Sequence, residues 1–128
     1  MDQIANLLIG LKNAGFVNKA TAIVPHSKVK EAIASVLKEE GYIKTYHVNS
    51  NGVKKTLELV LAYEGKTPRV SEVKRLSKLG LRKYYKVEDI KKVRNGQGLL
   101  VLSTPKGILT GALARKENVG GEALFEIW

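Results

Sequence analysis

Residues 42–61 read YIKTYHVNSNGVKKTLELVL, and this stretch decides the fold of the first half of the chain. Its second part predicts a strand with one buried face, with Leu57, Leu59 and Leu61 on that face and Thr56, Glu58 and Val60 on the other. The preceding Asn49-Ser50-Asn51-Gly52 is the strongest turn signal, because Asn-Gly tolerates positive φ at both central positions of a hairpin turn. Residues 42–48 are therefore expected to be the partner strand of a hairpin.

Two helices and a strand are predicted ahead of this hairpin. Apolar residues recur at helical spacing over residues 4–11, with Asp2 as the N-cap and residues 13–15 as the end. A short strand follows over residues 21–24. Ser27 is suited to cap a second helix, which Gly41 ends. The first sixty or so residues thus predict helix, strand, helix and hairpin, which is a small α+β unit.

A linker is expected over residues 63–68, and the character of the chain changes beyond it. Residues 66–94 hold eleven of the 22 basic residues and only three acidic ones. The spacing of Val70, Val73, Leu76 and Leu79 suits a helix, whereas the valines and Gly80 also suit a strand followed by a turn. The sequence leaves both alternatives open.

The last forty residues predict mainly strands. Residues 87–94 suggest a short helix or helical turn, with Ile90 and Val93 facing inward. Residues 99–102 form an apolar run typical of a central strand. The expected order beyond it is a loop over residues 103–107, a short helix over residues 109–116 and a final strand over residues 123–127.

The predicted fold class is therefore α+β with two small domains. Residues 1–64 form an N-terminal domain with the helix, strand, helix and hairpin. Residues 65–128 form a C-terminal, mostly β domain with one or two short helices.

The charge balance indicates a polyanionic partner. Among 128 residues, 22 Lys and Arg face 12 Asp and Glu, so the formal net charge is +10 and the pI is about 9.8. Nucleic acid is the first candidate, an anionic membrane surface the second, and a basic protein without such a partner the third. There is no cysteine, and no apolar run approaches the roughly 20 residues of a membrane span. With no basic signal-peptide start, the chain is expected to be cytoplasmic.

Catalytic groups are not evident in the sequence. The two histidines, His26 and His47, belong to no metal-binding spacing, and neither has a recognisable nucleophile partner. There is no phosphate-binding glycine loop in the order that a dinucleotide fold requires. We therefore expect a protein that is not an enzyme and that has neither a cofactor nor a metal site.

Two short segments near the C-terminus can form a binding site. Ser103 and Thr104 carry hydroxyls that can read a 2′-OH, a base edge or a phosphate. Gly107 and the pair Gly120-Gly121 permit positive φ and close approach of another backbone. Glu122 would accept from base amino groups or position its neighbours. From composition alone, tight turns joining short elements explain these segments equally well.

These segments also carry a resemblance. Residues 103–110 (STPKGILT) and residues 114–122 (ARKENVGGE), with the closing Trp128, resemble the C-terminal signature of the family of bacterial small-subunit ribosomal protein number eight. The opening segment DQIANLL, residues 24–28 and residues 76–82 match further landmarks of that family. The order of the landmarks agrees along the whole chain.

The sequence departs from the family pattern at three places. Gly10, Leu11 and Lys12 stand where the family usually has Arg-Ile-Arg, which puts an RNA contact of the first helix in doubt. Leu79 replaces the usual proline before Gly80. Gly111 and Leu113 replace acidic residues that would help to start the helix after Thr110.

The resemblance implies a protein that binds the central domain of small-subunit ribosomal RNA early in assembly, contacts neighbouring ribosomal proteins and represses its own operon messenger RNA. It also implies a monomer outside the ribosome and no membrane contact. The implied RNA-binding residues are Lys28, Lys30, Lys54, Lys55, Ser103, Thr104, Lys106, Gly107, Thr110, Asn118, Gly120, Gly121 and Glu122.

Three hypotheses make different predictions. A specific ribosomal RNA-binding protein would lose more specific than non-specific binding on Thr104→Ala. A general basic nucleic-acid-binding protein would lose little from that change and much from Lys91→Glu with Lys92→Glu. An enzyme that acts on RNA would depend on His26 or His47 in a cleavage assay.

Overall fold

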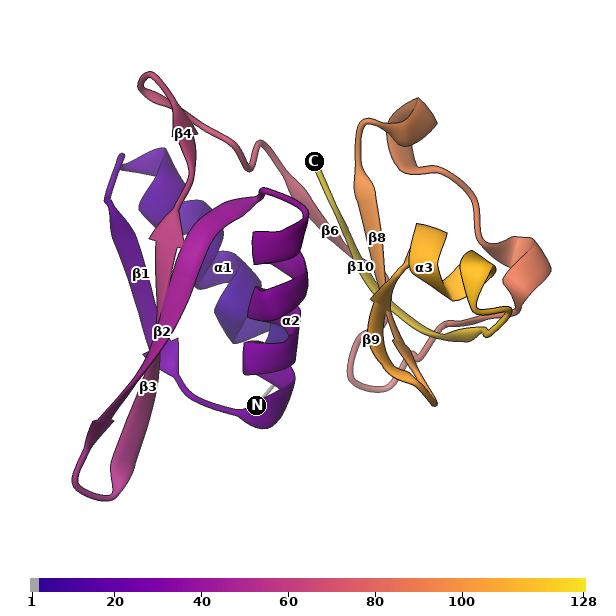
Figure 1. Ribbon diagram of the computed structural model, residues 1–128, viewed down its shortest axis with the longest axis horizontal. Helices are drawn as coiled ribbons and strands as arrows, with labels where there is room; N and C mark the ends of the chain where they lie inside the picture. The colour runs from indigo at the N-terminus through magenta and orange to yellow at the C-terminus, as the bar shows by residue number, and fades with distance from the viewer. Residues whose placement is uncertain (1–2) are drawn as a thin grey trace. The chain divides into compact units, whose positions relative to one another are not determined.

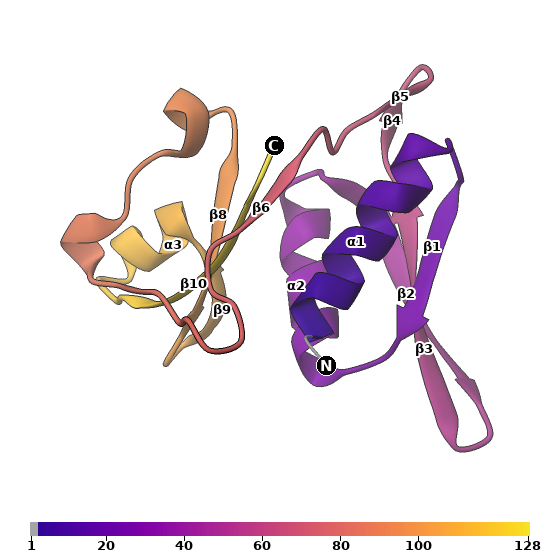
Figure 2. The same cartoon turned by 180° about the vertical axis from the view of Figure 1, so that it is seen from behind.

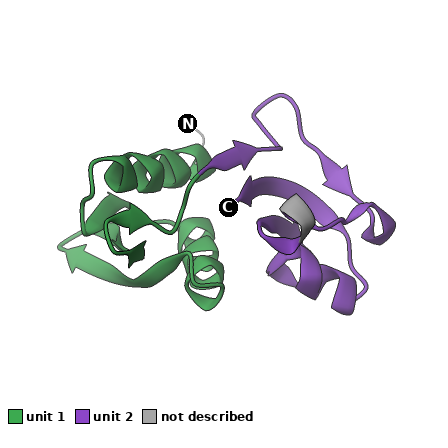
Figure 3. Ribbon diagram, turned by 90° about the horizontal axis from the view of Figure 1, so that it is seen from above, with its two compact units in different colours: residues 1–71 green, residues 72–128 purple. Residues whose placement is uncertain are grey.

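The computed structural model (Figure 1) describes residues 3–128, without the side chains of residues 94 and 95. The chain divides into two compact units, residues 1–71 and residues 72–128, which Figure 3 colours separately. The boundary between the units follows Ser71, whereas the sequence placed the domain boundary after Glu64. The predicted N-cap Asp2 lies outside the described residues. Among the described helices, none is long and apolar enough to cross a membrane.

Unit 1 is a three-stranded antiparallel sheet with two helices on one face, as Figures 1 and 2 show from opposite sides. The order of the strands is β1-β3-β2. The elements are α1 (Gln3–Phe16), β1 (Thr21–Pro25), α2 (Lys28–Glu39), β2 (Ile43–Asn51) and β3 (Lys54–Leu61). The predicted helix, strand, helix and hairpin are thereby confirmed.

The core of unit 1 lies between the helices and the inner face of this sheet. Leu57 and Leu59 of β3 are fully buried, and Leu61 is nearly so, as their alternation predicted. The helices contribute Leu7, Leu8, Leu11, Ala14, Ile33, Ala34 and Leu37. The side chain of Ser27 caps α2, since its Oγ accepts from the N–H of Lys30 at 3.1 Å.

The hairpin turn lies one residue later than predicted. Asn51 pairs with Lys54 across the strands, so the central turn residues are Gly52 and Val53. Gly52 has a φ of +67°. The turn therefore needs a glycine at its first central position, and Asn51 is the last residue of β2.

Residues 63–68 form a small hairpin instead of the predicted linker. Its strands are β4 (Tyr63–Glu64) and β5 (Thr67–Pro68), and Gly65 at the turn has a φ of +63°. The N–H of Arg69 donates to the carbonyl of Ala62 at 2.9 Å. These bonds make the segment part of unit 1.

Unit 2 is a second antiparallel sheet, in the order β6-β10-β8-β9, with β7 beside β10. Residues 66–94 contain strands and turns and no α-helix, so the strand alternative left open by the sequence is correct. The elements of unit 2 are β6 (Val73–Arg75), β7 (Tyr84–Tyr85), the 3-10 turns η1 (Val87–Asp89) and η2 (Val93–Gly96), β8 (Leu99–Thr104), β9 (Gly107–Thr110), α3 (Gly111–Lys116) and β10 (Gly121–Ile127).

The core of unit 2 joins the short elements to the sheet. Ile90 and Val93 are buried, as predicted, and pack with other apolar residues, namely Leu76, Leu100, Leu102, Ala114 and Ala123. The central position of β8 is confirmed. The predicted loop over residues 103–107 is wrong, because Thr104 and Gly107 pair across a β-hairpin. Leu109 belongs to the second strand of that hairpin, so α3 begins two residues later than predicted.

Candidate nucleic-acid interface

The turn between β8 and β9 is held by its own threonine. Thr104 Oγ1 donates to the carbonyl of Gly107 at 2.8 Å and accepts from the N–H of Lys106 at 3.1 Å. Gly107 has a φ of +110°, which L residues with a side chain rarely adopt. The Lys106 Nζ lies 3.4 Å from a carboxylate oxygen of Glu117, near the end of α3. The hydroxyl of Thr104 therefore fixes the shape of the turn.

The double glycine at the start of β10 allows its neighbours to approach closely. A Cβ on Gly121 would collide with the carbonyl of Ser103, and a Cβ on Gly120 would collide with the carbonyl of Tyr85. Neither glycine has a positive φ. Their bare backbone therefore serves packing within the protein, and the conformational freedom predicted from the sequence applies only to Gly107.

Strand pairing brings the two predicted segments together in one row across the sheet. Glu122 of β10 lies opposite Ser103 of β8 on one side and opposite Tyr84 of β7 on the other. Ser103 in turn pairs with Ile108 of β9. Directly paired residues of an antiparallel sheet project to the same face. A hydroxyl, a carboxylate and a phenol ring thus stand side by side.

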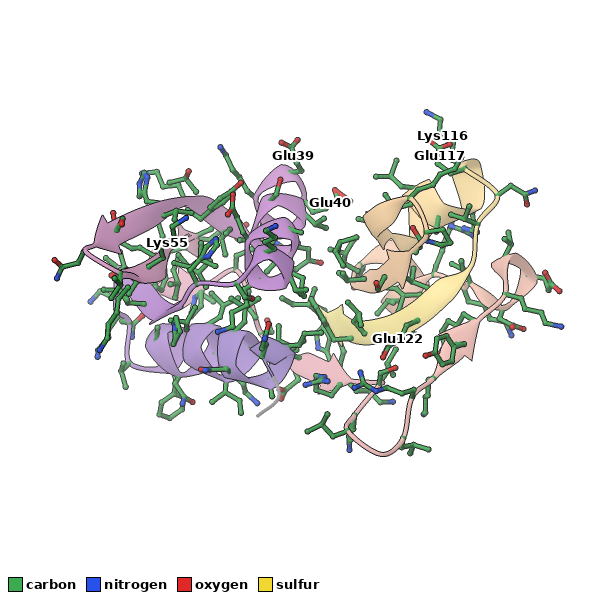
Figure 4. The ribbon with its side chains drawn as sticks, turned by 90° about the horizontal axis from the view of Figure 1, so that it is seen from below. Glu39, Glu40, Lys55, Lys116, Glu117 and Glu122 are labelled. Carbon is green, nitrogen blue, oxygen red and sulfur yellow. The ribbon has the colours of Figure 1, made fainter. Side chains whose placement is uncertain are left out.

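The carboxylate in this row holds a cation. Arg82 Nη1 lies 3.1 Å from Glu122 Oε2, and the side chains are 48% and 18% exposed, respectively. Figure 4 shows Glu122 on β10, separate from Glu117 and Lys116 at the end of α3. Glu122 therefore orients Arg82, which is one of the two roles that the sequence offered for it.

A buried serine fixes the loop that carries this arginine. Ser77 is fully buried, and its Oγ accepts from the N–H of Lys83 at 2.9 Å and donates to the carbonyl of Lys83 at 3.2 Å. Both ends of the loop over residues 78–82 are thereby joined. Arg82 and Tyr84 are absent from the predicted site, although the basic and aromatic composition of residues 82–86 was a signal for them.

The two tyrosines of β7 face different environments. Tyr84 is 71% exposed, whereas Tyr85 packs against the core of unit 2. This division between one exposed ring and one core ring follows from the alternation of a strand. Tyr84 therefore offers an exposed ring beside Glu122.

Asn118 and Thr110 mark the two ends of α3. Asn118 has a φ of +57°, and the bonds from Asn118 N–H to Arg115 O and from Val119 N–H to Ala114 O form a Schellman motif. Thr110 is 2% exposed, and its Oγ1 accepts from the N–H of Leu113 at 3.1 Å. Both side chains thus have a clear structural role. The buried Thr110 is unsuited to direct contact with a ligand.

The comparisons with known proteins identify the family. The model of the family described as ribosomal protein S8 matches residues 2–128. The chain belongs to the ribosomal protein S8 family. It is 47% identical to small ribosomal subunit protein uS8 of Persephonella marina, over 99% of this chain and 98% of that protein. The family predicted from the sequence landmarks is therefore confirmed.

Other S8 relatives match over similar lengths. The uS8 protein of Albidiferax ferrireducens is 48% identical, over 96% of this chain and 94% of that protein. The uS8 protein of Mycoplasmopsis synoviae is 46% identical, over 99% of this chain and 97% of that protein. The similarity thus extends over both units.

The four lysines predicted for S8-type RNA binding lie in unit 1, and three of them are exposed. Lys28, Lys54 and Lys55 are exposed, and the N–H of His26 donates to the carbonyl of Lys55 at 3.1 Å, so the start of β3 lies beside the segment that leads into α2. Figure 4 labels Lys55 on the sheet of unit 1. Lys30 is different: it is 3% exposed, and its Nζ donates to the carbonyl of Pro25 at 2.7 Å. Because its Nζ is buried and bonded to this carbonyl, Lys30 does not fit the predicted phosphate contact. Burial also lowers its pKa.

Metal binding has no support within residues 3–128. Their side chains, apart from those of residues 94 and 95, form no cluster of three or more His, Cys, Asp or Glu residues that could hold a metal ion. The row of Ser103, Glu122 and Tyr84 on unit 2 instead offers hydrogen-bonding groups, the cation of Arg82 and an exposed ring.

Proposed function

We propose that this chain binds small-subunit ribosomal RNA specifically, through the row of Ser103, Glu122, Arg82 and Tyr84 on unit 2. As a member of the S8 family, it is a non-enzymatic structural protein of the small ribosomal subunit. The observation that carries the specific proposal is the strand register, which places Ser103 and Tyr84 on either side of Glu122.

The chemistry of the row suits an irregular RNA surface. Specific recognition of RNA reads unpaired or splayed bases through hydrogen bonds and through stacking on rings. In this proposal, Ser103 reads a 2′-OH or a base edge, Arg82 binds a phosphate and Tyr84 stacks on a base. Glu122 holds the guanidinium in place. The turn shaped by Thr104 supplies exposed backbone, and its Lys106 adds a cation.

The lysines of unit 1 contribute in a different way. Lys28, Lys54 and Lys55 are exposed cations that would neutralise phosphates, which strengthens binding to any RNA and makes it salt-dependent. Such contacts position a protein without reading the sequence. Specificity in this account therefore comes from unit 2.

The resemblance supports a finer proposal for the target. The chain binds the central domain of 16S ribosomal RNA, helps to assemble the platform of the subunit and represses translation of its own operon messenger RNA. The alternative is a general basic nucleic-acid-binding protein, which would bind the 16S fragment and any duplex with similar affinity.

A comparison of the affinities for two RNAs distinguishes these functions. Affinity is measured by filter binding for a central-domain 16S fragment and for a regular duplex of mixed sequence. We expect Ser103→Ala and Glu122→Gln to weaken binding of the fragment about three- to tenfold and to leave duplex binding unchanged. Ser103→Ala removes a hydroxyl that bonds to the RNA, and Glu122→Gln removes the charge that holds Arg82 in place. The control Lys54→Ser should weaken both and reduce the salt slope by about one. Equal affinity of the wild type for both RNAs would reject specific recognition.

A further inference from the structure

We propose that unit 1 carries a second RNA site, a pair of adjoining hollows beside the end of α1 that accepts two consecutive unpaired nucleotides. The site is built from Phe16, Asn18, Tyr63 and Lys66. The proposal rests on the proposed RNA-binding function, but it concerns residues that the row on unit 2 does not use.

The two hollows adjoin each other because they share residues. The first, of about 370 Å³, is lined by Phe16, Asn18 and Lys66 among others, and the second, of about 330 Å³, by Tyr63 together with the same Asn18 and Lys66. All of these residues belong to unit 1. In Figure 2 the turn between β4 and β5 lies near the C-terminal end of α1. One aromatic residue therefore borders each hollow, and a lysine stands between them.

Phe16 has no packing role that would explain its position. Its side chain is 86% exposed, at the last residue of α1. An aromatic ring in the open is a platform on which any base can stack, because every base has a π-face. The substitution Phe16→Ala would remove that platform without disturbing a buried contact.

The backbone around the hollows is fixed before any ligand binds. Asn18 has a φ of +58°, and the bonds from Asn18 N–H to Gly15 O at 3.1 Å and from Lys19 N–H to Ala14 O at 2.9 Å form a Schellman motif. The hydroxyl of Tyr63 donates to the carbonyl of Lys19 at 2.6 Å. The two aromatic residues are therefore attached to one rigid corner.

The charge of the hollows fits nucleotides better than a protein segment. No carboxylate is among the residues that line them in the described part of the chain, whereas Lys12 and Lys66 line the first. The shared position of Lys66 suits the phosphate that links two nucleotides. Asn18, Thr67 and Ser71 supply the amide and hydroxyl groups that can bond to base edges or a 2′-OH.

Titration of the ¹⁵N-labelled full chain with single-stranded hexauridylate tests this site by NMR. We expect shifts of the Phe16, Asn18 and Lys66 amides, and at least a fivefold loss of affinity at that site in Phe16→Ala, as for a lost base–aromatic stack. Ile9→Ala, at a 58% exposed apolar position of the same helix, is the matched control and should leave the affinity unchanged. Lys66→Ser should weaken binding more than Lys44→Ser, which removes an exposed lysine of β2.

Two results would overturn the proposal: no shifts at Phe16, Asn18 and Lys66 at saturating hexauridylate, or equal losses in Phe16→Ala and Ile9→Ala. Binding of the wild type to the central-domain fragment is measured in parallel. Specific binding of that fragment without hexauridylate shifts in the hollows rejects the second site alone. Hexauridylate bound in the hollows, with no preference for the fragment over a duplex, rejects the proposed specific function and leaves the second site standing.

Discussion

Lys30 shows how one residue type can serve opposite purposes on the same helix turn. Lys28 is exposed at the start of α2, whereas Lys30 is buried and donates to the carbonyl of Pro25. That bond satisfies a carbonyl at the end of β1, an edge strand of its sheet. Burying an ammonium is costly even when it is hydrogen-bonded. The side chain of Lys30 therefore joins α2 to the end of β1. The burial of its charged form costs part of the stability that this bond provides.

The stability of Lys30→Met relative to wild type should depend on pH. Burial lowers the folded-state pKa of Lys30 below its ordinary value of 10.5. Between the folded and unfolded pKa values the unfolded chain binds more protons, so the contribution of Lys30 to stability rises with pH. In urea unfolding at pH 7 and at pH 10, the free energy of unfolding of wild type relative to that of Lys30→Met should be larger at the higher pH. A constant difference between the two proteins would contradict a lowered pKa.

At the scale of elements, the glycines at the start of β10 allow that strand to lie against both neighbours. Gly121 lies against the carbonyl of Ser103, so the register that forms the row depends on the absence of a Cβ. Gly52 in the β2–β3 turn is different, because its surroundings are open and only its φ of +67° requires glycine.

Alanine substitutions at these two glycines should separate collision from backbone strain. Gly121→Ala should lower the free energy of unfolding by about 3 kcal/mol or more, because backbone atoms of β8 would have to move. Gly52→Ala should cost about 1 kcal/mol, the usual penalty for a left-handed conformation. Chemical denaturation of both variants measures this difference. Equal losses would mean that β8 and β10 separate easily at this point.

The elements were predictable wherever a local pattern reflects burial. The leucines of β3 alternate because one face of the strand is covered by helices, and Ser27 precedes α2 because the helix start needs an acceptor. The hairpin over residues 104–107 was missed, because a hydroxyl-rich turn looks like any loop until its strand partner is known. Its neighbour on β10 is distant in the sequence, so no local pattern could show that Ser103 and Glu122 pair.

The candidate site was predictable only in part, for a related reason. The motif residues of β8 and β10 were found from the sequence, but Arg82 was not, because its role depends on the ion pair with Glu122. The burial of Lys30 and Thr110 was missed too. A lysine near a helix start looks like an anion ligand until its surroundings are known.

At the scale of the whole molecule, a formal net charge of +10 is a general attraction for RNA, and a few groups must make it specific. The basic stretch over residues 66–94 contains much of this charge. In our account the basic residues of that stretch supply non-specific affinity, apart from Arg82 in the row on unit 2 and Lys66 in the proposed second site. In the proposed function the specific contacts gather in unit 2, where three strands place a hydroxyl, the carboxylate that holds Arg82 and an exposed ring in one row.

Ultraviolet cross-linking of the full chain to the central-domain 16S fragment, with mass-spectrometric mapping of the joined peptides, tests this claim most directly. We predict cross-links in residues 82–86, 103–107 and 118–122 that persist at physiological salt, because these segments hold the specific contacts. Cross-links confined to residues 87–94 or to the lysines of unit 1, and lost as salt rises, would contradict the account and indicate general electrostatic binding.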